Sequence, residues 1–347
     1  MVSRFLNIII SSIIIHIIFL VSVSAQTGGD NVYEFLNLTH SGLVTSLGGT
    51  NVSLITNNPD LSYHNPALLS SDMNNALALN YANYFAGINY GQAMFSKTFS
   101  GTCNFAAGIT YLNYGSFTAA DETGTITGTF SAAEYAFSLI ASKDIDSSFS
   151  VGLSLKPVLS TLEKYTSFGL ACDIGTSWHS KNRLISAGFV LKNAGLQLTT
   201  YWGENRRKLP FEIESGASVR LAHAPLRFSL TARHLEKYDL TTDYSNDGPG
   251  NTGSSHSFFD NLMRHMIAGV ELIPHKNFWF SAGYNYQRRK ELQVESVSSA
   301  AGFSWGFGIN TSFLNIEFGR ATYHLAGSVT NISLVFRPDM VIRKLRG

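Results

Sequence analysis

Charge is scarce in this sequence. Charged residues make up 14% of the 347 residues, whereas soluble domains usually carry roughly 25%. The net charge is only +1, so the charge balance gives no indication of a nucleic-acid partner. Low charge without long apolar runs is more typical of a membrane β-protein than of a helical membrane protein.

Cysteine is almost absent as well, since the chain holds only Cys103 and Cys172. Two cysteines are too few for a disulfide scaffold or for a zinc site made of four thiolates. An exported protein could form a disulfide between them. The two residues fall on strands that we do not expect to be neighbours, which favours two free thiols.

Long hydrophobic runs are missing beyond residue 25. The one run of transmembrane length, Phe5–Val23, follows Arg4 and ends in Val23-Ser24-Ala25, a small-residue cleavage pattern. We therefore predict a secretory signal peptide over residues 1–25, cut before Gln26; the alternative is an uncleaved anchor helix. A mature chain without such a run can enter a membrane only as a closed barrel, because open strand edges are too costly in lipid.

Catalytic and cofactor motifs are missing too. The sequence contains no GxSxG, HExxH, Walker or CxxC motif. Its ten histidines are scattered, and the oxygen-rich stretch 243–253 lacks the ordered spacing and terminal Glu of an EF-hand calcium loop. We predict that the protein is not an enzyme and that it has no cofactor and no metal site.

The dominant pattern that is present is alternation of apolar and small residues. Between residues 301 and 310, every other residue is apolar, and successive side chains of a strand point to opposite faces. The apolar set is Ala301, Phe303, Trp305, Phe307 and Ile309. Such a strand suits a soluble sandwich with its apolar face inward, or a transmembrane barrel with its apolar face toward lipid.

Strands of this kind follow one another from about residue 75, with no helical period between them. We count about 14 segments of roughly ten residues, the length that a tilted strand needs to cross a bilayer. Short connections such as Ile145–Ser147 alternate with longer, more polar ones. The longer ones are Ser116–Gly124, Tyr201–Lys208, Thr241–Asp260 and Arg288–Ser298. Outer-membrane barrels sort short periplasmic turns from long extracellular loops in this way, and a sandwich has no reason to do so.

These patterns predict an all-β fold, a transmembrane antiparallel barrel over residues 74–340 with a basic tail over residues 341–347. An even strand number would leave both chain ends in the periplasm, with the protein integral to a bacterial outer membrane. Residues 26–73 do not alternate, and Pro59 and Pro66 break regular structure there. We predict that this N-terminal segment plugs the barrel as a hatch; the alternative is a lid folded over one end.

The small, polar face of the strands carries charged residues. In a barrel these side chains face the lumen and must pair with one another or with the plug, because charge at lipid depth is costly. The residues are Lys156, Lys192, Glu212, Glu214, Arg227, Arg233, Glu271 and Glu317. Aromatic residues near strand ends, Tyr90 and Trp279 among them, are predicted to form girdles at the membrane interfaces.

Several short sequences, in a fixed order, carry a resemblance to a known family. They are Tyr33-Glu34-Phe35-Leu36, Leu47-Gly48-Gly49, Asn65-Pro66-Ala67-Leu68-Leu69, Asn113-Tyr114-Gly115, Gly128-Thr129-Phe130, Lys192-Asn193-Ala194-Gly195, Leu209-Pro210-Phe211 and His223-Ala224-Pro225. With them the chain resembles the PorQ family, outer-membrane components of the bacterial type IX secretion system. That family is related to the PorV shuttle proteins and, more distantly, to the FadL fatty-acid transporters, whose barrels carry an N-terminal hatch.

The resemblance implies a non-enzymatic role in protein secretion. PorQ-like proteins belong, with a PorU-like sortase and a PorV-like shuttle, to the attachment complex that joins secreted cargo to lipopolysaccharide. They are understood to hold a PorZ-like protein at the cell surface. The expected partners are therefore these proteins and outer-membrane lipid or lipopolysaccharide, with no nucleic acid.

The alternative function is a FadL-like transporter of hydrophobic small molecules. Such a transporter should have an apolar lumenal pocket near the plug and a lateral opening where a strand is kinked. The charges predicted in the lumen weigh somewhat against an apolar conduit. A soluble periplasmic β-sandwich is a third alternative, which the sorting of the loops disfavours.

The family supplies no residue-level binding motif, so the predicted extracellular loops are the physical candidates for partner contact. We single out the aromatic and charged residues of the two loops Tyr201–Lys208 and Thr241–Asp260. They are Tyr201, Trp202, Arg206, Arg207, Asp243, Tyr244, Asp247, Phe258 and Phe259. Loss of the second loop without loss of the partner would contradict this hypothesis.

Overall fold

The computed structural model describes residues 31–84, 87–99, 103–203, 205–240, 258–292, 300–324 and 327–341. The predicted signal peptide over residues 1–25 lies outside these described residues, as do the tail from residue 342 and the candidate loop residues Asp243, Tyr244 and Asp247. Among the described residues, no helix has both the length and the apolar character needed to cross a membrane.

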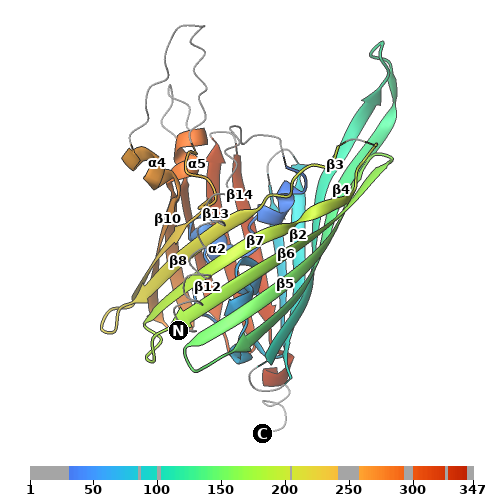
Figure 1. Cartoon of the computed structure of the whole chain (residues 1–347). Helices are drawn as coiled ribbons and strands as arrows, with labels where there is room; N and C mark the ends of the chain where they lie inside the picture. Colours follow the sequence, from blue (N-terminus) through green and yellow to red (C-terminus); the bar gives the residue numbers. More distant parts are fainter. Residues whose placement is uncertain are drawn as a thin grey trace, which may run out of the picture. The chain divides into compact units, whose positions relative to one another are not determined.

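Fourteen antiparallel strands close into a barrel (Figure 1). Each strand pairs with its neighbours in the chain, and β1 completes the ring by pairing with β14. The strands are β1 Ala76–Asn83, β2 Asn89–Thr98, β3 Cys103–Ala120, β4 Ile126–Asp144, β5 Phe149–Leu162, β6 Tyr165–His179, β7 Ile185–Thr199, β8 Glu212–Arg220, β9 Leu226–Ala232, β10 Met266–His275, β11 Phe278–Asn285, β12 Phe303–Asn310, β13 Leu314–His324 and β14 Gly327–Phe336. The closed ring confirms the predicted all-β barrel.

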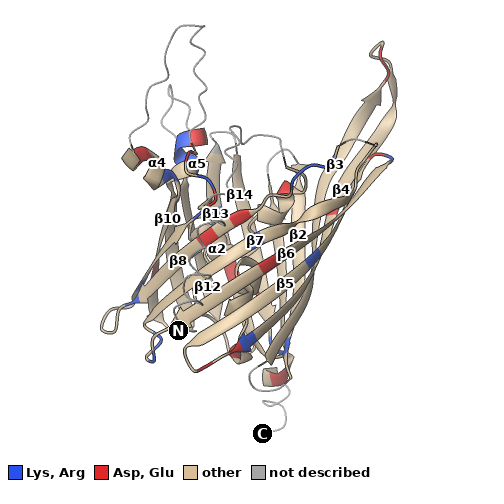
Figure 2. Ribbon diagram, in the orientation of Figure 1, with Lys and Arg blue, Asp and Glu red and all other residues tan. Residues whose placement is uncertain are grey.

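The outer surface of the wall is apolar, as the alternation predicts. On β3, Phe105, Ile109 and Tyr111 are exposed, and on β12 Phe303 and Trp305 are about half exposed. Figure 2 shows that most of the ribbon between the two ends of the barrel is uncharged. Such a belt suits the hydrocarbon core of a bilayer, where a charged side chain on the lipid face costs about 2–4 kcal/mol.

Three residues deviate from the predicted pattern. Ala301 is fully buried before β12 begins, because Gly302, with φ +86°, turns the chain into the strand. Tyr90 and Trp279 are only 3% and 5% exposed, so they face the lumen and form no part of an interfacial girdle. Trp279 fits there because its neighbour across the ladder is Gly308, where an added Cβ would lie 2.4 Å from the indole ring.

Residues 31–73 fold inside the barrel, and we call them the plug. Their short helices are η1 Glu34–Asn37, α2 Gly42–Ser46, α3 Leu61–His64, η2 Pro66–Leu68 and η3 Ser71–Met73. Most plug residues are buried. Helix α2 packs on β12, β13 and β14, whereas η2 packs on β4, β5 and β6. The plug therefore contacts two separate parts of the wall.

The plug approaches the wall most closely at inward-facing glycines. An added Cβ at Gly188 of β7 would lie 1.9 Å from the carbonyl oxygen of Val52. One at Gly319 of β13 would lie 2.1 Å from the carbonyl oxygen of Gly42. No larger side chain fits at either position unless the plug moves. The small residues of the alternating pattern thus shape the lumen around the plug.

The connections at the two ends of the barrel differ in length. One end, the short-turn end, has brief turns after β4, β6, β8, β10 and β12. The other, the long-loop end, carries α4 (Phe258–Arg264) before β10 and α5 (Tyr286–Leu292) after β11. The predicted sorting of loops is incomplete at this end, because a tight turn at Glu163 and Lys164 joins β5 to β6.

The predicted loop Ser116–Gly124 is mostly strand, which corrects the expectation from its polar sequence. Both β3 and β4 continue beyond the rest of the wall as a hairpin (Figure 1). The ladders to β2 and β5 end at Asn113 and Ala132, so residues 116–130, which we call the arm, have strand partners only in each other. The wall is thus tall at β3 and β4, with 18 and 19 residues, and several other strands are short, since β1, β11 and β12 have 8 residues each. We call β8 and β9, with 9 and 7 residues, the low part of the wall.

Candidate functional site

Strand β7 loses its partner on one side halfway along its length. It pairs with β6 as far as Thr199, but its ladder with β8 stops at Lys192, because β8 begins only at Glu212. Pro210, just before β8, has no N–H with which to extend that ladder. In the part of the chain that the structure describes, residues 193–199 of β7 are therefore a free strand edge. We call the space beside this edge the β7–β8 gap.

A β-bulge marks the start of the gap. Lys192 and Asn193 of β7 are both buried opposite Asp173 of β6, where the register between the two strands shifts. Asn193 adopts a left-handed backbone conformation, with φ +54°. Its backbone N–H donates to Asp173 Oδ1 over 2.8 Å, and its side-chain Nδ2 donates to the carbonyl oxygen of Pro210 over 3.1 Å. Strand β7 is thus irregular at Asn193, next to the point where its ladder with β8 ends.

Side chains and the plug close the gap. The N–H of Arg207 donates to Gln197 Oε1 of β7 over 3.0 Å. A hydrogen bond to a side chain thus takes the place of a main-chain hydrogen bond between strands. Asn31 of the plug forms one parallel bridge with Lys208, and the N–H of Val32 donates to the carbonyl oxygen of Lys208 over 2.9 Å. The closure depends on a few separate hydrogen bonds, each with a net contribution of roughly 0.5–1.5 kcal/mol.

An apolar cluster lies directly behind the gap. Leu209, from the segment that closes the gap, packs there with the plug and with inward-facing residues of β1 to β6. The cluster consists of Val32, Tyr33, Phe35, Leu36, Ala82, Tyr90, Leu112, Ala136, Val158, Ala171 and Leu209. The Tyr33 ring reaches the wall, where an added Cβ at Gly169 would lie 2.4 Å from it, and its hydroxyl bonds Ser167 Oγ over 2.5 Å. Apolar side chains therefore fill this part of the lumen.

Buried charges form a layer on the short-turn side of the cluster. Lys156 Nζ lies 2.5 Å from Asp173 Oδ2, and both side chains are fully buried. Lys192 Nζ lies 3.4 Å from Glu214 Oε1, and this pair is buried as well. Removing one partner of such a pair costs about 3–5 kcal/mol, because the other charge is left buried and uncompensated. These pairs, which come from β5 to β8, border the apolar cluster on its short-turn side.

Two arginines make two-point contacts with carboxylates in the lumen. Arg233 donates from Nε and Nη2 to the two oxygens of Glu212 over 2.6 and 2.8 Å. Arg227 donates from Nε and Nη2 to the two oxygens of Glu271 over 2.6 Å each. This paired geometry is the strongest that arginine and a carboxylate form. The pairings confirm the prediction that the lumenal charges compensate one another.

The plug adds polar contacts and buried histidines, of which His40 lies next to the apolar cluster. Glu317 of β13 accepts a hydrogen bond from Asn58 Nδ2 of the plug over 2.9 Å. His40 meets Tyr63 and Tyr90 edge to face, with ring centroids 4.6 and 5.6 Å away. Burial, with two nearby lysine charges as the second cause, lowers the pKa of His40 to about 3. The His40 ring is therefore uncharged at physiological pH.

Two of the candidate loop residues pack against the barrel. Tyr201 is half-buried beside the apolar cluster, and its hydroxyl donates to Ser160 Oγ over 2.7 Å. Trp202 is 73% exposed and stacks on Tyr165, with ring centroids 5.3 Å apart. Tyr201 thus contributes to the rim of the lumen, and Trp202 presents a surface at the long-loop end.

The other described candidates are exposed. Arg206 and Arg207 lie in the segment that closes the β7–β8 gap. Phe258 and Phe259 lie on α4, and each is 66% exposed. A role of these residues in partner contact stays a prediction.

Asp173 is a site residue that no sequence pattern above singles out, and Asn193 appears there only within the motif of residues 192–195. Asp173 lies between Cys172 and Ile174, on the small, polar face of an alternating strand. Lys192 and Asn193 are two polar residues in succession, and such a break in the alternation is the signal of a bulge. An acidic residue on the lumenal face of one strand, together with two successive polar residues in the next strand, is the sequence signal that would have indicated this site.

The described residues contain no group of three or more His, Cys, Asp or Glu side chains placed to hold a metal ion. Cys103 and Cys172 are both free and partly exposed, as their separation predicts. Apolar side chains and paired charged groups line the wall and lumen around the gap.

No protein-family model matches the chain, and no curated protein matches it. Its fold is similar to several solved channels. The CymD monoaromatic hydrocarbon channel is 12% identical over 87% of this chain and 98% of its own, with a TM-score of 0.54. A deletion mutant of the TodX monoaromatic hydrocarbon channel has the same identity and coverage, with a TM-score of 0.53. A FadL homologue from Pseudomonas aeruginosa is 10% identical over 86% of this chain and 98% of its own, with a TM-score of 0.52.

These likenesses concern the fold, because the identities are low. They show that the chain has the barrel architecture of FadL-type channels. A closed antiparallel barrel with an apolar outer belt is the architecture of an integral outer-membrane protein. Membership of the PorQ family stays a prediction from the sequence.

Proposed function

We propose that the protein is an outer-membrane channel that passes a small apolar molecule sideways through the β7–β8 gap. The observation that carries the proposal is the free edge of β7 with an apolar cluster directly behind it. A molecule that enters at the long-loop end and takes over contacts within the cluster would reach lipid without crossing the whole lumen. The similarity of the fold to hydrocarbon channels supports a transport role.

The charged layer favours a sideways path. An apolar molecule that moved further along the lumen on this side would meet the buried pair Lys156–Asp173, whose separation costs several kcal/mol. The outer side of the gap offers an apolar surface instead, since Leu196 and Leu198 of β7 are 50% and 38% exposed. The path of lowest free energy for an apolar molecule therefore leads through the gap and into the bilayer.

The first residues of the plug act as the gate. The bridge between Asn31 and Lys208 and the bond from Val32 to Lys208 must break for the segment to move. Two bonds of this kind contribute about 1–3 kcal/mol. An apolar molecule that replaces Tyr33 or Leu209 in the cluster offsets part of this cost, so ligand binding shifts the gate toward its open state.

A reversible disulfide across the gate tests the proposal. Asn31 and Lys208 are bridge partners, and partners in a ladder lie at Cα separations that a disulfide accepts. In the double variant Asn31→Cys/Lys208→Cys, we expect uptake of radiolabelled toluene, a monoaromatic hydrocarbon, by cells carrying the protein to fall at least ten-fold on oxidation. Uptake should return to the wild-type rate on reduction.

The single variants are the matched controls, because each introduces one thiol beside the native Cys103 and Cys172. Neither should respond to oxidation. Toluene uptake that equals that of cells lacking the protein, in both redox states, would contradict the transport proposal. Uptake by the oxidised double variant at the wild-type rate would contradict a gate at this position.

A second candidate function is the surface scaffold that the resemblance to the PorQ family implies. The arm favours it, because residues 116–130 have open strand edges on both sides and are mostly exposed. The arm contains no Lys, Arg or Pro, the residues that usually protect such edges. In this proposal a PorZ-like surface protein binds the long-loop end, with PorU-like and PorV-like proteins and lipopolysaccharide in the same complex.

Affinity recovery tests the scaffold. A tagged full-length protein is purified from detergent-solubilised outer membranes, and the bound proteins are identified by mass spectrometry. We expect a PorZ-like protein with the wild type and not with a variant whose arm is replaced by a tight turn. Recovery of the barrel without any surface protein would contradict the scaffold function.

A further inference from the structure

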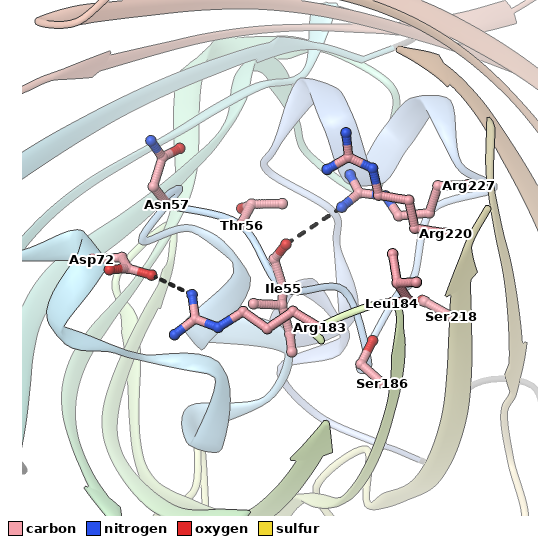
Figure 3. A pocket seen from close by; sticks show the side chains of 10 residues that line it. All are labelled: Ile55, Thr56, Asn57, Asp72, Arg183, Leu184, Ser186, Ser218, Arg220 and Arg227. Atoms are coloured by element: carbon pink, nitrogen blue, oxygen red, sulfur yellow. Dashed lines mark hydrogen bonds and ion pairs between the residues drawn. The ribbon is translucent and has the colours of Figure 1, made fainter. Parts of the chain in front are cut away.

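The short-turn end of the barrel holds a small pocket between plug and wall. It has a volume of about 220 Å³ and is lined by plug residues 55–57 and Asp72, and by wall residues near the β6–β7 turn and the ends of β8 and β9. Figure 3 shows Arg183 directed at Asp72 on one side of the pocket, with Arg220 and Arg227 together on the other. The pocket is smaller than the roughly 300–1,000 Å³ of sites for drug-sized ligands.

Arg220 and Arg227 make this pocket electrostatically unusual. They are directly opposed on the neighbouring strands β8 and β9, and like charges directly opposed across a ladder destabilise a sheet. Glu271 compensates Arg227 with two bonds of 2.6 Å, and Arg227 Nη1 also donates to the carbonyl oxygen of Ile55 over 3.4 Å. Arg220 has no acidic partner among the described residues. The pocket therefore carries one uncompensated guanidinium group.

The third arginine of the pocket is only weakly engaged. Arg183 Nη1 lies 3.0 Å from Asp72 Oδ2, but the two side chains are 60% and 53% exposed. Exposed pairs of this kind contribute little to stability, so a ligand can compete for Arg183. The hydroxyl groups of Ser186 and Ser218, which bond Ser53 of the plug, line the pocket between the arginines.

We propose that this pocket binds a phosphate group. Guanidinium groups match phosphate oxygens with paired hydrogen bonds, and a pocket of 220 Å³ holds a head group rather than a whole amphiphile. The phosphate belongs either to a soluble compound at the short-turn end or to the head group of a membrane lipid. The site is independent of the β7–β8 gap, which lies at the other end of β7.

Phosphate titration of the purified full-length protein in a zwitterionic detergent tests the site. Inorganic phosphate is titrated calorimetrically against a chloride buffer of equal ionic strength, and we expect saturable binding. Arg220→Gln should weaken it at least ten-fold. Arg206→Gln, the same charge change on an exposed arginine in the β7–β8 connection, should change it less than two-fold. Asp72→Asn should strengthen binding, because it releases Arg183.

The lipid source is tested with the protein in nanodiscs of phosphatidylglycerol or of a galactolipid, which carries no phosphate. The site is assigned to a lipid head group if phosphatidylglycerol raises the thermal stability of the wild type but not of Arg220→Gln, and if free phosphate does not bind. Two results would overturn the proposal. One is the absence of Arg220-dependent binding with both probes, and the other is an equal loss of binding in Arg206→Gln.

Discussion

The tall and the low parts of the wall differ in strand length, and the two lengths suit different roles. At β3 and β4 the strands have 18 and 19 residues, far more than the roughly 9–11 that cross a bilayer. At β8 and β9 they have 9 and 7, and the plug and residues 207–211 complete the wall. The extra length of β3 and β4 provides a surface outside the membrane. The late start of β8 leaves an opening in the wall that other segments must close.

The largest effect is expected at the buried charge pair between β5 and β6, beside the strand β7 that the short β8 leaves partly unpaired. Lys156→Met leaves Asp173 buried without its counter-charge, and we expect a loss of about 3–5 kcal/mol in unfolding free energy. Urea unfolding of the micelle-bound barrel, followed by gel mobility, measures it. The double variant Lys156→Met/Asp173→Leu should recover at least half of the loss. A single variant as stable as the wild type would show that the charged layer does not support this part of the wall.

A moderate effect is expected where the plug touches the wall. Gly188→Ala places a Cβ 1.9 Å from the carbonyl oxygen of Val52, and we expect a loss of about 1–3 kcal/mol as plug and wall move apart. Gly216→Ala is the matched control, since Gly216 pairs with Gly188 across the ladder and the nearest atoms to its Cβ would be Val52 Cγ2 at 3.1 Å, Thr231 Oγ1 at 3.2 Å and the Leu230 carbonyl oxygen at 3.3 Å. Equal losses in the same urea experiment would mean that the close approach at Gly188 is not specific.

A small effect is expected when the tall part of the wall is shortened. Replacing residues 116–130 by a tight turn removes the Phe117–Phe130 stack, which lies within the arm, but no contact between barrel and plug. We expect the unfolding free energy to change by less than about 1 kcal/mol. Thermal unfolding of the shortened barrel in micelles measures the change. A large loss would mean that the arm stabilises the barrel rather than extends it.

The smallest effect is expected at the helices of the long-loop end. Asp260 of α4 accepts a hydrogen bond of 2.6 Å from the Tyr286 hydroxyl of α5 and one of 3.0 Å from Arg264 Nε. The Tyr286 bond is the main cause that lowers the pKa of Asp260 from 3.8 to about 2. Because the folded pKa is lowered, the contact stabilises α4 and α5 above about pH 4 and is lost as the pH falls toward 2.

Hydrogen exchange of the α4 amides measures that contact. Exchange should accelerate between pH 4 and pH 2 beyond the intrinsic change, and Asp260→Asn should remove this pH dependence. A wild type and a variant that exchange alike across this range would contradict the assignment.

The sequence predicts the wall well, because alternation reports which face of a strand meets lipid. Phe303 to Ile309 are exposed on alternate positions as expected, and the predicted lumenal charges pair in the lumen. The arm escapes prediction because Gly115, Gly124 and Gly128 make its sequence resemble a loop. The lumenal position of Trp279 could not be predicted, because the alternation does not show that the lumen has room for a large aromatic residue opposite Gly308.

The candidate sites are harder to predict, because they depend on where strands stop. Strand β8 begins only at Glu212, which leaves β7 unpaired with β8 beyond Lys192, and no local pattern fixes the residue at which a strand begins. The opposition of Arg220 and Arg227 is likewise set by the register of β8 and β9. Exposed loop residues such as Trp202 and Phe258 can be identified from the sequence, but the residues that they contact cannot.

The position of a bound apolar probe tests the central claim most directly. Crystals of the protein are soaked with bromobenzene, and the bromine is located by its anomalous scattering. We expect bromine beside Tyr33 and Leu209, behind the β7–β8 gap. Bromine only on the outer belt, with an unaltered cluster, would contradict a path for apolar molecules through the low part of the wall.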